Sequence, residues 1–203
     1  MALGLTAVGL TGCGHNGTPG TEVVHVVAAD LDGQPVGGYR LTPSGSNVNT
    51  VSDCDGSPAA VAPGIYRCSP SAAGADVCWP APDALLCVDD PWHKTLHRVA
   101  VAGVLPQVQP PNTPQPFALL LEGDLHCRLR NGGAWGGRDD GYIGAYGCES
   151  SDLVVLAPAD GKAVDDSATP WKVKVGELGT GEAHFPPPTT VVVRTAWFAG
   201  DPG

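Results

Sequence analysis

The sequence predicts a mainly β fold, built as two β-rich halves that are joined by a Pro-rich connector and stapled by disulfides, with little helix. Three observations predict it. Glycine and proline, at 28 and 20 of 203 residues, favour many turns and short strands. No segment sustains the 3.6-residue apolar period of an amphipathic helix. Six cysteines after the N-terminal region form an even set, as in exported proteins with disulfides.

The N-terminal half, residues 22–104, is predicted to hold short strands separated by turn residues. The apolar residues Val23–Val27 lead into Asp30–Gly33, the pattern of a strand that meets a tight turn. Further strands are expected at Tyr39–Leu41, Gly64–Cys68, Ala75–Trp79, Ala84–Val88 and Leu96–Val101. Helix is limited to one turn at most, at Asp83–Leu86 or His93–His97.

Residues 105–116 are rich in proline and are predicted to be an extended connector, because proline lacks an N–H and clashes with a preceding helical turn. The C-terminal half, residues 117–200, begins with a hairpin signal, Glu122–Asp124. Its strands are expected at Phe117–Leu121, His126–Arg130, Tyr142–Tyr146, Leu153–Leu156, Trp171–Val175 and Thr190–Phe198.

The six later cysteines are predicted to form disulfides. Six cysteines allow 15 connectivities, and pairing of sequence neighbours is the simplest. It gives Cys54–Cys68, Cys78–Cys87 and Cys127–Cys148. Each bond would close a short loop, worth about 2–3 kcal/mol. The alternative is a zinc or thiol site, but the chain has no Cys-x-x-Cys pair.

The first twelve residues are uncharged and mostly apolar or small, and this run stops at Cys13. It is shorter than the roughly 20 residues that span a bilayer and is typical of a signal-peptide apolar region. The last four residues, Leu10, Thr11, Gly12 and Cys13, resemble the bacterial lipobox, which implies cleavage after Gly12 and lipidation of Cys13. Residues 13–21 would then be a flexible tether, and several acyl chains would make the attachment durable.

Signal peptides begin with a positively charged segment, but no lysine or arginine precedes Arg40. We therefore expect the natural start to lie upstream of Met1, or the start at Met1 to be misassigned. The alternative interpretation of residues 1–13 is a buried N-terminal strand with a free thiol at Cys13.

The net charge of −10 argues against nucleic acid as a partner, because an acidic surface repels phosphate backbones. The chain has no Lys/Arg cluster of the kind that adheres to anionic lipid. The expected partners are the membrane, through the lipid, and an envelope protein, glycan or lipid ligand.

The glycine-rich segment between Cys127 and Cys148 is the first candidate for binding. Pinned at both ends by a disulfide, it would present an aromatic ring and charged groups that suit a glycan. The candidate binding residues are Trp135, Arg138, Asp139, Asp140 and Tyr142. In the alternative interpretation, Trp135 covers the core and Arg138 pairs with Asp139 or Asp140.

Other site types are weakly supported. His93 and His97 have metal-ligand spacing on a helix, but Lys94 and Arg98 flank them and oppose a cation. Asp30–Gly33 resembles the start of a calcium loop, yet the position that needs a glutamate is Leu41. No Gly-x-Ser-x-Gly or nucleotide-binding glycine motif occurs. We therefore assign no catalytic residue, no metal ligand and no cofactor.

Several segments resemble a family of uncharacterised secreted proteins and lipoproteins of mycobacteria and related actinobacteria. They are Ser69–Pro80, Leu86–Trp92, Cys127–Cys148 and Thr195–Gly200. The resemblance implies an extracytoplasmic location and a lineage, but no activity.

Two functions remain open. The first is a non-catalytic binding or interaction module that is held on the outer face of the cell membrane. The second is an envelope hydrolase that uses paired carboxylates, Asp139 with Asp89 or Asp90, provided that they meet in one cleft.

Overall fold

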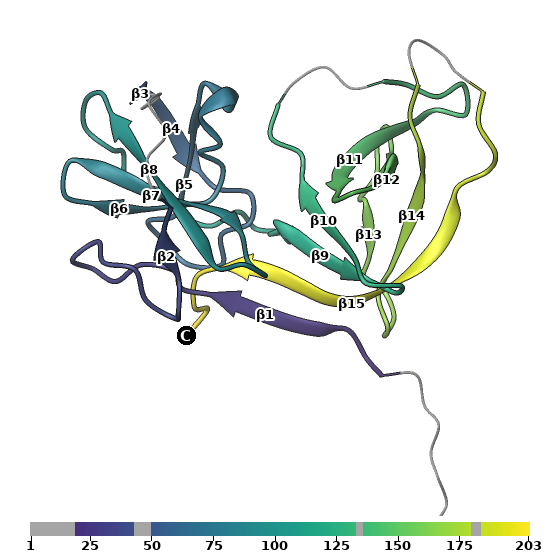
Figure 1. The fold of residues 1–203 in the computed structure, drawn as a ribbon, viewed down its shortest axis with the longest axis horizontal. Helices are drawn as coiled ribbons and strands as arrows, with labels where there is room; N and C mark the ends of the chain where they lie inside the picture. Colours follow the sequence, from purple (N-terminus) through teal and green to yellow (C-terminus); the bar gives the residue numbers. More distant parts are fainter. Residues whose placement is uncertain (1–18, 43–49, 133–135, 180–183) are drawn as a thin grey trace, which may run out of the picture.

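The computed structural model describes residues 19–42, 50–132, 136–179 and 184–203. This part of the chain is mainly β, as predicted, and forms two sheets (Figure 1). The helical content of the described residues is one short 3₁₀ turn, Ser71–Ala73. Cys13 and Trp135 lie outside the described residues, so the predicted lipidation site and the aromatic ring of the glycine-rich segment are not placed.

The C-terminal half folds into a closed barrel (Figure 1). Its strands are β9 (Ala118–Leu121), β10 (Leu125–Leu129), β11 (Tyr142–Cys148), β12 (Leu153–Pro158), β14 (Lys172–Glu177) and β15 (Thr189–Ala199). Sequential strands pair antiparallel, and β15 pairs with both β14 and β9, which closes the barrel. The short strand β13 (Val164–Asp165) adds to β14. Inward-facing side chains fill the interior, among them Leu119, Leu121, Tyr146, Val155, Val173, Val175, Val193 and Phe198.

The second sheet is built from the N-terminal half. Its strands are β2 (Arg40–Leu41), β3 (Thr50–Val51), β4 (Asp53–Gly56), β5 (Tyr66–Ser69), β6 (Cys78–Ala81), β7 (Ala84–Asp90) and β8 (Thr95–Val101). The order is β2-β8-β7-β6-β5-β4, and β3 also pairs with β8. The central strand β7 is buried over five consecutive residues, because both of its faces are covered.

The first strand, β1 (Glu22–Val26), belongs to the sheet of the C-terminal half. It pairs in parallel with the end of β15, from Glu22 opposite Thr195 to Val26 opposite Ala199. The first described strand and the end of the last one therefore lie side by side (Figure 1). One hydrophobic cluster draws on both halves and includes Val26, Ile65, Trp79, Leu86, Val88, Leu96, Phe117, Ala118 and Ala199. The two halves share a core rather than packing as independent units.

The connector 105–116 has no regular secondary structure, as predicted, but it is held along its length. Tyr66 donates its hydroxyl hydrogen bond to the carbonyl of Pro106 at 2.9 Å. Farther along, the N–H of Gln115 donates to the carbonyl of Pro58 at 3.0 Å. The hydroxyl of the buried Tyr146 donates to the Pro116 carbonyl at 2.7 Å, and burial raises the pKa of this phenol. These bonds make the connector a strap rather than a free linker.

The six later cysteines are paired as predicted, in consecutive pairs along the sequence. The disulfides Cys54–Cys68, Cys78–Cys87 and Cys127–Cys148 each join residues that lie directly opposite one another on adjacent strands. Three disulfides indicate an oxidising, extracytoplasmic compartment. Within the described residues, no helix has the length and apolar character needed to cross a membrane.

Most expected strands are present, and the expected turns at Asp30–Gly33 and Glu122–Asp124 are confirmed. The suggested helical turns are wrong. Residues 83–86 enter β7 directly, and residues 93–97 form a turn that continues into β8, so the one helical turn of the described chain is Ser71–Ala73. Three short strands, β3, β4 and β13, were not expected, because two of them are two residues long and β4 contains aspartate and glycine.

Candidate functional site

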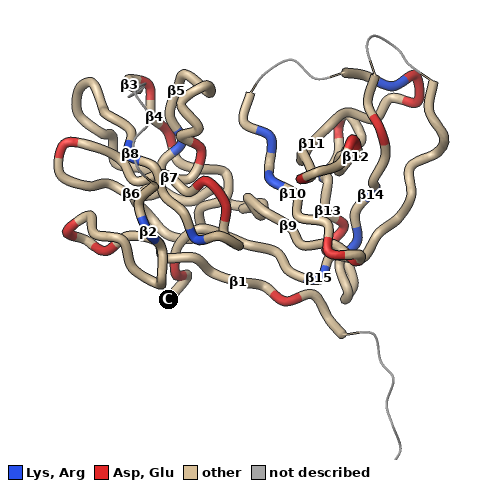
Figure 2. Tube along the Cα trace, in the orientation of Figure 1, with Lys and Arg blue, Asp and Glu red and all other residues tan. Residues whose placement is uncertain are grey.

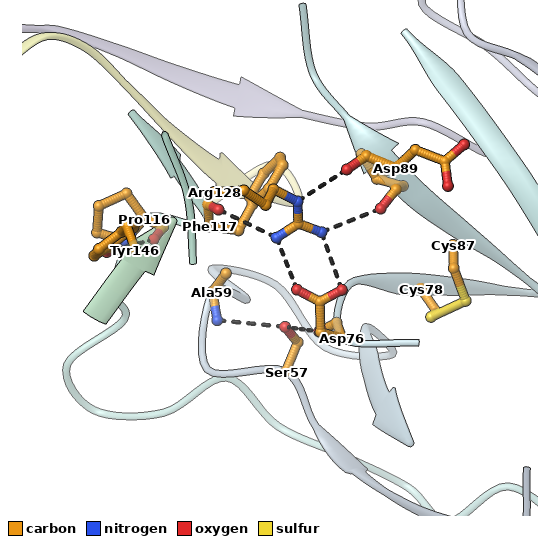
Figure 3. A network of polar contacts seen from close by, with 11 residues as sticks. Ser57, Ala59, Asp76, Cys78, Cys87, Asp89, Pro116, Phe117, Arg128 and Tyr146 are labelled. Atoms are coloured by element: carbon orange, nitrogen blue, oxygen red, sulfur yellow. Dashed lines mark hydrogen bonds and ion pairs between the residues drawn. A yellow bond between two sulfur atoms is a disulfide. The ribbon is translucent and has the colours of Figure 1, made fainter. Parts of the chain in front are cut away.

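Arg128, on β10 of the barrel, reaches across to the other half of the molecule (Figure 3). Its Nη1 and Nη2 atoms bind the two oxygens of Asp76 at 2.7 and 3.0 Å. The remaining donors bind the carbonyls of Asp89 (3.0 Å), Phe117 (3.1 Å) and Val88 (3.1 Å). All five N–H groups of the guanidinium are thus used inside the protein. Arg128 therefore joins the two halves and has no donor left for a ligand.

The backbone of Asp76 is fixed by a hydrogen bond from Ser57. The buried hydroxyl of Ser57 donates to the Asp76 carbonyl at 2.7 Å and accepts the N–H of Ala59 at 3.4 Å. The Asp76 side chain is 10% exposed, so removing its charged partner would leave a carboxylate in a poorly solvated position. This geometry suits a structural ion pair and not a proton-transfer residue.

His97 lies beside this ion pair. Its Nδ1 is 2.6 Å from an oxygen of Asp89, and its Nε2 is 3.0 Å from the carbonyl of Ala73. Both neighbours are acceptors, so the ring is best satisfied when both nitrogens carry protons. The Asp89 hydrogen bond raises the pKa of His97, against the opposing effect of burial. A histidine with both nitrogens engaged in this way is poorly placed to act as a general base.

A cleft of about 350 Å³ lies over these groups, between the two halves. We call it the interface cleft; it is lined by Ser71, Ala72, Gly74, Asp76, Val88, Asp89, His97, Arg128, Leu129 and Asn131. Its charged groups are already paired with one another. The buried Nδ2 of Asn131, a residue at the wall of this cleft, has no hydrogen-bond partner among the described residues.

Two of the predicted binding residues, Arg138 and Asp140, are engaged with each other. Arg138 is buried, and its guanidinium binds both oxygens of Asp140 at distances from 2.6 to 3.1 Å. It also donates to the carbonyls of Glu177 and Pro186. This matches the alternative interpretation, in which Arg138 pairs with a neighbouring aspartate. The hydrogen bond from Arg138 holds the pKa of Asp140 below its usual value.

The other two described candidates face outward. Asp139 lies 2.7 Å from Nδ1 of the exposed His184, across the gap between two loops of the barrel. Tyr142 is half-buried at the start of β11 and lines a small groove with Lys172 and Lys174. Asp139, His184 and Tyr142 remain accessible, whereas Arg138 does not.

The three carboxylates of the hydrolase hypothesis, Asp89, Asp90 and Asp139, make contacts with different groups. Asp89 lines the interface cleft and binds His97, and Asp139 binds His184 at the barrel loops. Asp139 is not among the residues that line the interface cleft. Asp90 caps its own turn, where it accepts the N–H of His93 at 2.6 Å. No observation in the described structure favours their use as a catalytic pair.

A larger cleft, of about 400 Å³, lies where the end of the connector meets the segment after β12. We call it the Trp171 cleft. Its apolar surface comes from Pro114, Pro116, Ala145, Tyr146, Ala157, Ala163, Val164, Trp171 and Phe198, and its polar rim from Thr113, Gln115, Lys162 and Asp166. Trp171 is half-buried and meets the ring of Phe198 edge-on, with centroids 6.4 Å apart. This volume falls in the range of small-molecule sites.

Trp171 is positioned by the start of the chain. The hydroxyl of Thr21 accepts the Trp171 N–H at 2.7 Å and donates to the carbonyl of Val193 at 2.7 Å. The N–H of Val193 in turn donates to the Trp171 carbonyl at 2.9 Å. The backbone of Trp171 is thus fixed by two segments that are distant in sequence. Neither this cleft nor the Arg128–Asp76 pair was predicted, because nothing in the local sequence marks which distant segments meet.

Basic positions are few and separated. Figure 2 shows that lysine and arginine fall singly along the strands of both halves, among more numerous acidic positions. The two arginines with the most internal bonds, Arg128 and Arg138, are committed to Asp76 and Asp140. Because these two arginines are already paired with aspartates, they do not form a basic patch on the described surface.

Comparisons with protein-family models, with curated proteins and with solved structures find no match for this chain.

Proposed function

We propose that this protein is a lipid-anchored, non-catalytic binding module on the outer face of the cell membrane, and that its ligand is a saccharide. The lipobox-like residues before Cys13 support the anchor. The three disulfides support an extracytoplasmic setting. The resemblance to secreted proteins and lipoproteins of mycobacteria and related actinobacteria supports placement in a bacterial envelope.

The Trp171 cleft is the observation that carries the binding proposal. Sugars present an apolar face of C–H groups and a rim of hydroxyls, so they suit an aromatic wall flanked by polar side chains. Trp171 supplies the wall, and Gln115, Lys162 and Asp166 stand on the rim. Lys162 and Asp166 are 3.7 Å apart and more than half exposed, so their ion pair contributes little to stability. Both groups can therefore bind ligand hydroxyls instead of each other at little cost in free energy.

A saccharide fits this cleft better than an acyl chain does. An acyl chain is held most strongly where apolar walls remove nearly all of its surface from water. Here the entrance is ringed by polar side chains: Thr113, Gln115 and Lys162 are all exposed. A ring-sized ligand with hydroxyls would use both the apolar wall and this rim.

The test is binding of the mature chain, with Cys13→Ser, to an array of soluble bacterial cell-wall oligosaccharides, followed by calorimetry on the ligand found. Trp171→Ala should weaken binding by about tenfold, as expected for the loss of roughly 1.4 kcal/mol of ring contact. Trp171→Phe should retain most of it. Asp166→Asn should weaken binding, whereas Asp160→Asn, an exposed aspartate outside the cleft, should not.

The outcomes separate the two candidate regions. Unchanged binding in Trp171→Ala together with loss in Trp135→Ala would move the site to the glycine-rich segment. Binding of acyl chains alone would replace the saccharide with a lipid. The anchor is tested apart from these: mass spectrometry of the mature N-terminus should show a lipidated Cys13, and an unmodified Met1 on a product released from membranes would exclude it.

A further inference from the structure

Three potential metal ligands meet where the two halves touch. Asp90 is the last residue of β7, His93 lies in the turn that leads to β8, and Glu149 directly follows β11 of the barrel. One ligand atom from each lies within 4.8 Å of the other two. Two of them, Oδ2 of Asp90 and Nδ1 of His93, are already 3.2 Å apart. Ligands of a tetrahedral ion with bonds of about 2.1 Å are about 3.4 Å apart, so Asp90 and His93 already have nearly this spacing, and a small shift of the exposed Glu149 side chain would complete the set.

The two carboxylates are positioned by bonds that leave an oxygen for an ion. Oδ1 of Asp90 accepts the backbone N–H of His93 at 2.6 Å, which points Oδ2 at the imidazole. Oε1 of Glu149 accepts the indole N–H of Trp92 at 3.2 Å, which leaves Oε2 for coordination. The backbone of Glu149 is fixed as well, because its N–H donates to the carbonyl of His126 at 2.9 Å.

The neighbouring cations are turned away from this cluster. Lys94 follows His93 in sequence, but its Nζ donates to the carbonyl of Gly37 at 3.0 Å. Arg98 donates to the carbonyl of Pro82 at 2.6 Å. In the sequence, Lys94 and Arg98 lie close to His93, where they would repel a bound cation. In the structure, their charged groups are held by other parts of the chain. Glu149 lies far from the turn in sequence, which is why the histidine spacing alone points to no site.

We propose that Asp90, His93 and Glu149 bind a divalent transition-metal ion, with Zn²⁺ as the best match, and that water completes its coordination. One imidazole and two carboxylates favour a borderline ion over Ca²⁺ or Mg²⁺, which prefer oxygen ligands alone. The ion links the turn of the N-terminal half to the barrel, so its binding stabilises the contact between the halves. This site is separate from the Trp171 cleft and does not depend on the saccharide proposal.

Trp92 makes the site measurable. Its indole donates to Glu149, stacks on His126 with centroids 4.6 Å apart, and meets Trp197 at 6.0 Å. When Glu149 moves to an ion, the surroundings of this indole change. The fluorescence of Trp92 should therefore respond to Zn²⁺.

The experiment is calorimetric and fluorescence titration of the chelator-stripped mature chain with ZnCl₂, and with CoCl₂ for the visible spectrum of the coordinated ion. The wild type should bind one ion per chain and unfold at a higher temperature when loaded. Glu149→Gln and His93→Gln should each lower the affinity more than about tenfold, because each removes a direct ligand. His184→Gln is the matched control, since His184 also pairs with an exposed aspartate but belongs to no three-ligand cluster among the described residues.

Several results would overturn the proposal. These are no Zn²⁺ binding by the wild type at millimolar concentration, equal affinity in Glu149→Gln and the wild type, or an equal loss in His184→Gln. If His93→Gln fails to fold, Glu149→Gln decides alone, because Glu149 is exposed and its backbone bond does not depend on the side chain.

Discussion

At the scale of single residues, two arginines show how a charged group is used to build this molecule. Arg128 and Arg138 each bind an aspartate through both oxygens and add backbone carbonyls to complete their donors. Such groups stabilise a fold only when every donor is satisfied, because a buried unpaired charge is costly. Arg128 matters more for the whole chain, because its partner Asp76 belongs to the other half.

The first prediction concerns this pair. Arg128→Met should lower the free energy of unfolding by about 3–5 kcal/mol, because it leaves Asp76 buried without its partner. Arg194→Met is the matched control: Arg194 binds Asp124 at the same 2.7 Å distance, but both side chains are more than half exposed. That substitution should cost less than about 1 kcal/mol. Urea unfolding measures both, and equal losses would mean that Arg128–Asp76 behaves as a surface pair.

A second prediction concerns pH. The hydrogen bond to Asp89 raises the pKa of His97 above 6.5, so the stability from this bond is complete below pH 6.5 and is lost as pH rises through the folded-state value. Burial is the largest single effect and raises the pKa of Asp89, but the hydrogen bond and charge of His97, with the Thr95 hydrogen bond and the Arg128 charge, together lower that pKa below 3.8. The carboxylate's contribution is therefore present above pH 3.8 and is lost as pH falls through the folded-state value.

The measurement is urea unfolding with chelator present, at about pH 5.5 and about pH 8.5. The wild type should lose more stability on going to the higher pH than His97→Gln does. Asp76 and the Ala73 carbonyl also face the ring and favour its protonated form, so they act in the same direction. A pH dependence that is identical in the variant would show that His97 does not contribute it.

At the scale of elements, the disulfides hold together neighbouring strands whose own pairing is short. The strand β4, Asp53–Gly56, has few strand-forming residues, yet Cys54 joins it to β5. Cys127–Cys148 joins β10 to β11 around the glycine-rich segment. These bonds compensate for sequences that would form weak strands by themselves.

The third prediction compares two of these bonds. Replacing Cys127 and Cys148 by alanine should lower the free energy of unfolding by about 3 kcal/mol, because the bond closes a loop with a separation of 21 residues. The Cys78–Cys87 bond spans 9 residues, so its removal should cost about 0.7 kcal/mol less in the same chain-entropy estimate. Denaturant unfolding of the two double variants tests the order. A larger loss for the shorter loop would show that native packing, and not loop closure, decides.

The sequence predicted elements well where local signals are strong. β15 was expected because Thr190–Phe198 is dense in β-branched and aromatic residues, and the hairpin of β9 and β10 because glycine and aspartate separate two apolar runs. β3 and β13 were missed because two residues carry no alternation. The candidate sites were harder to predict from the sequence. Arg128 meets Asp76, and His93 meets Glu149, only because the two halves pack together.

At the scale of the whole molecule, the two halves share one hydrophobic core cluster. Val26 and Phe117 lie in the same core cluster as Trp79 and Leu86, and β1 is a strand of the barrel's sheet. The boundary at the connector is thus a boundary in sequence composition, whereas the core runs across it. A shift in amino-acid composition marks the connector in the sequence, but it does not show which surfaces the two halves bury against each other.

The fourth prediction follows from this shared core. Calorimetry of the mature, disulfide-intact chain should show a single unfolding transition, with calorimetric and van't Hoff enthalpies that agree. Residues 22–104 and 117–203 expressed apart should lack fixed tertiary structure, because each loses the partner of its core side chains. Two resolved transitions, or a separate half with a well-dispersed NMR spectrum, would contradict a single cooperative unit.

The pairing of β15 with β1, β9 and β14 also sets the order of events during biosynthesis. Ribosomes deliver the chain from its N-terminus, so β15, which closes the barrel and receives β1, emerges after every other strand of the described residues. Until it does, the barrel stays open and β1 has no neighbour. Closure of the barrel and docking of β1 are thereby deferred until β15 is available.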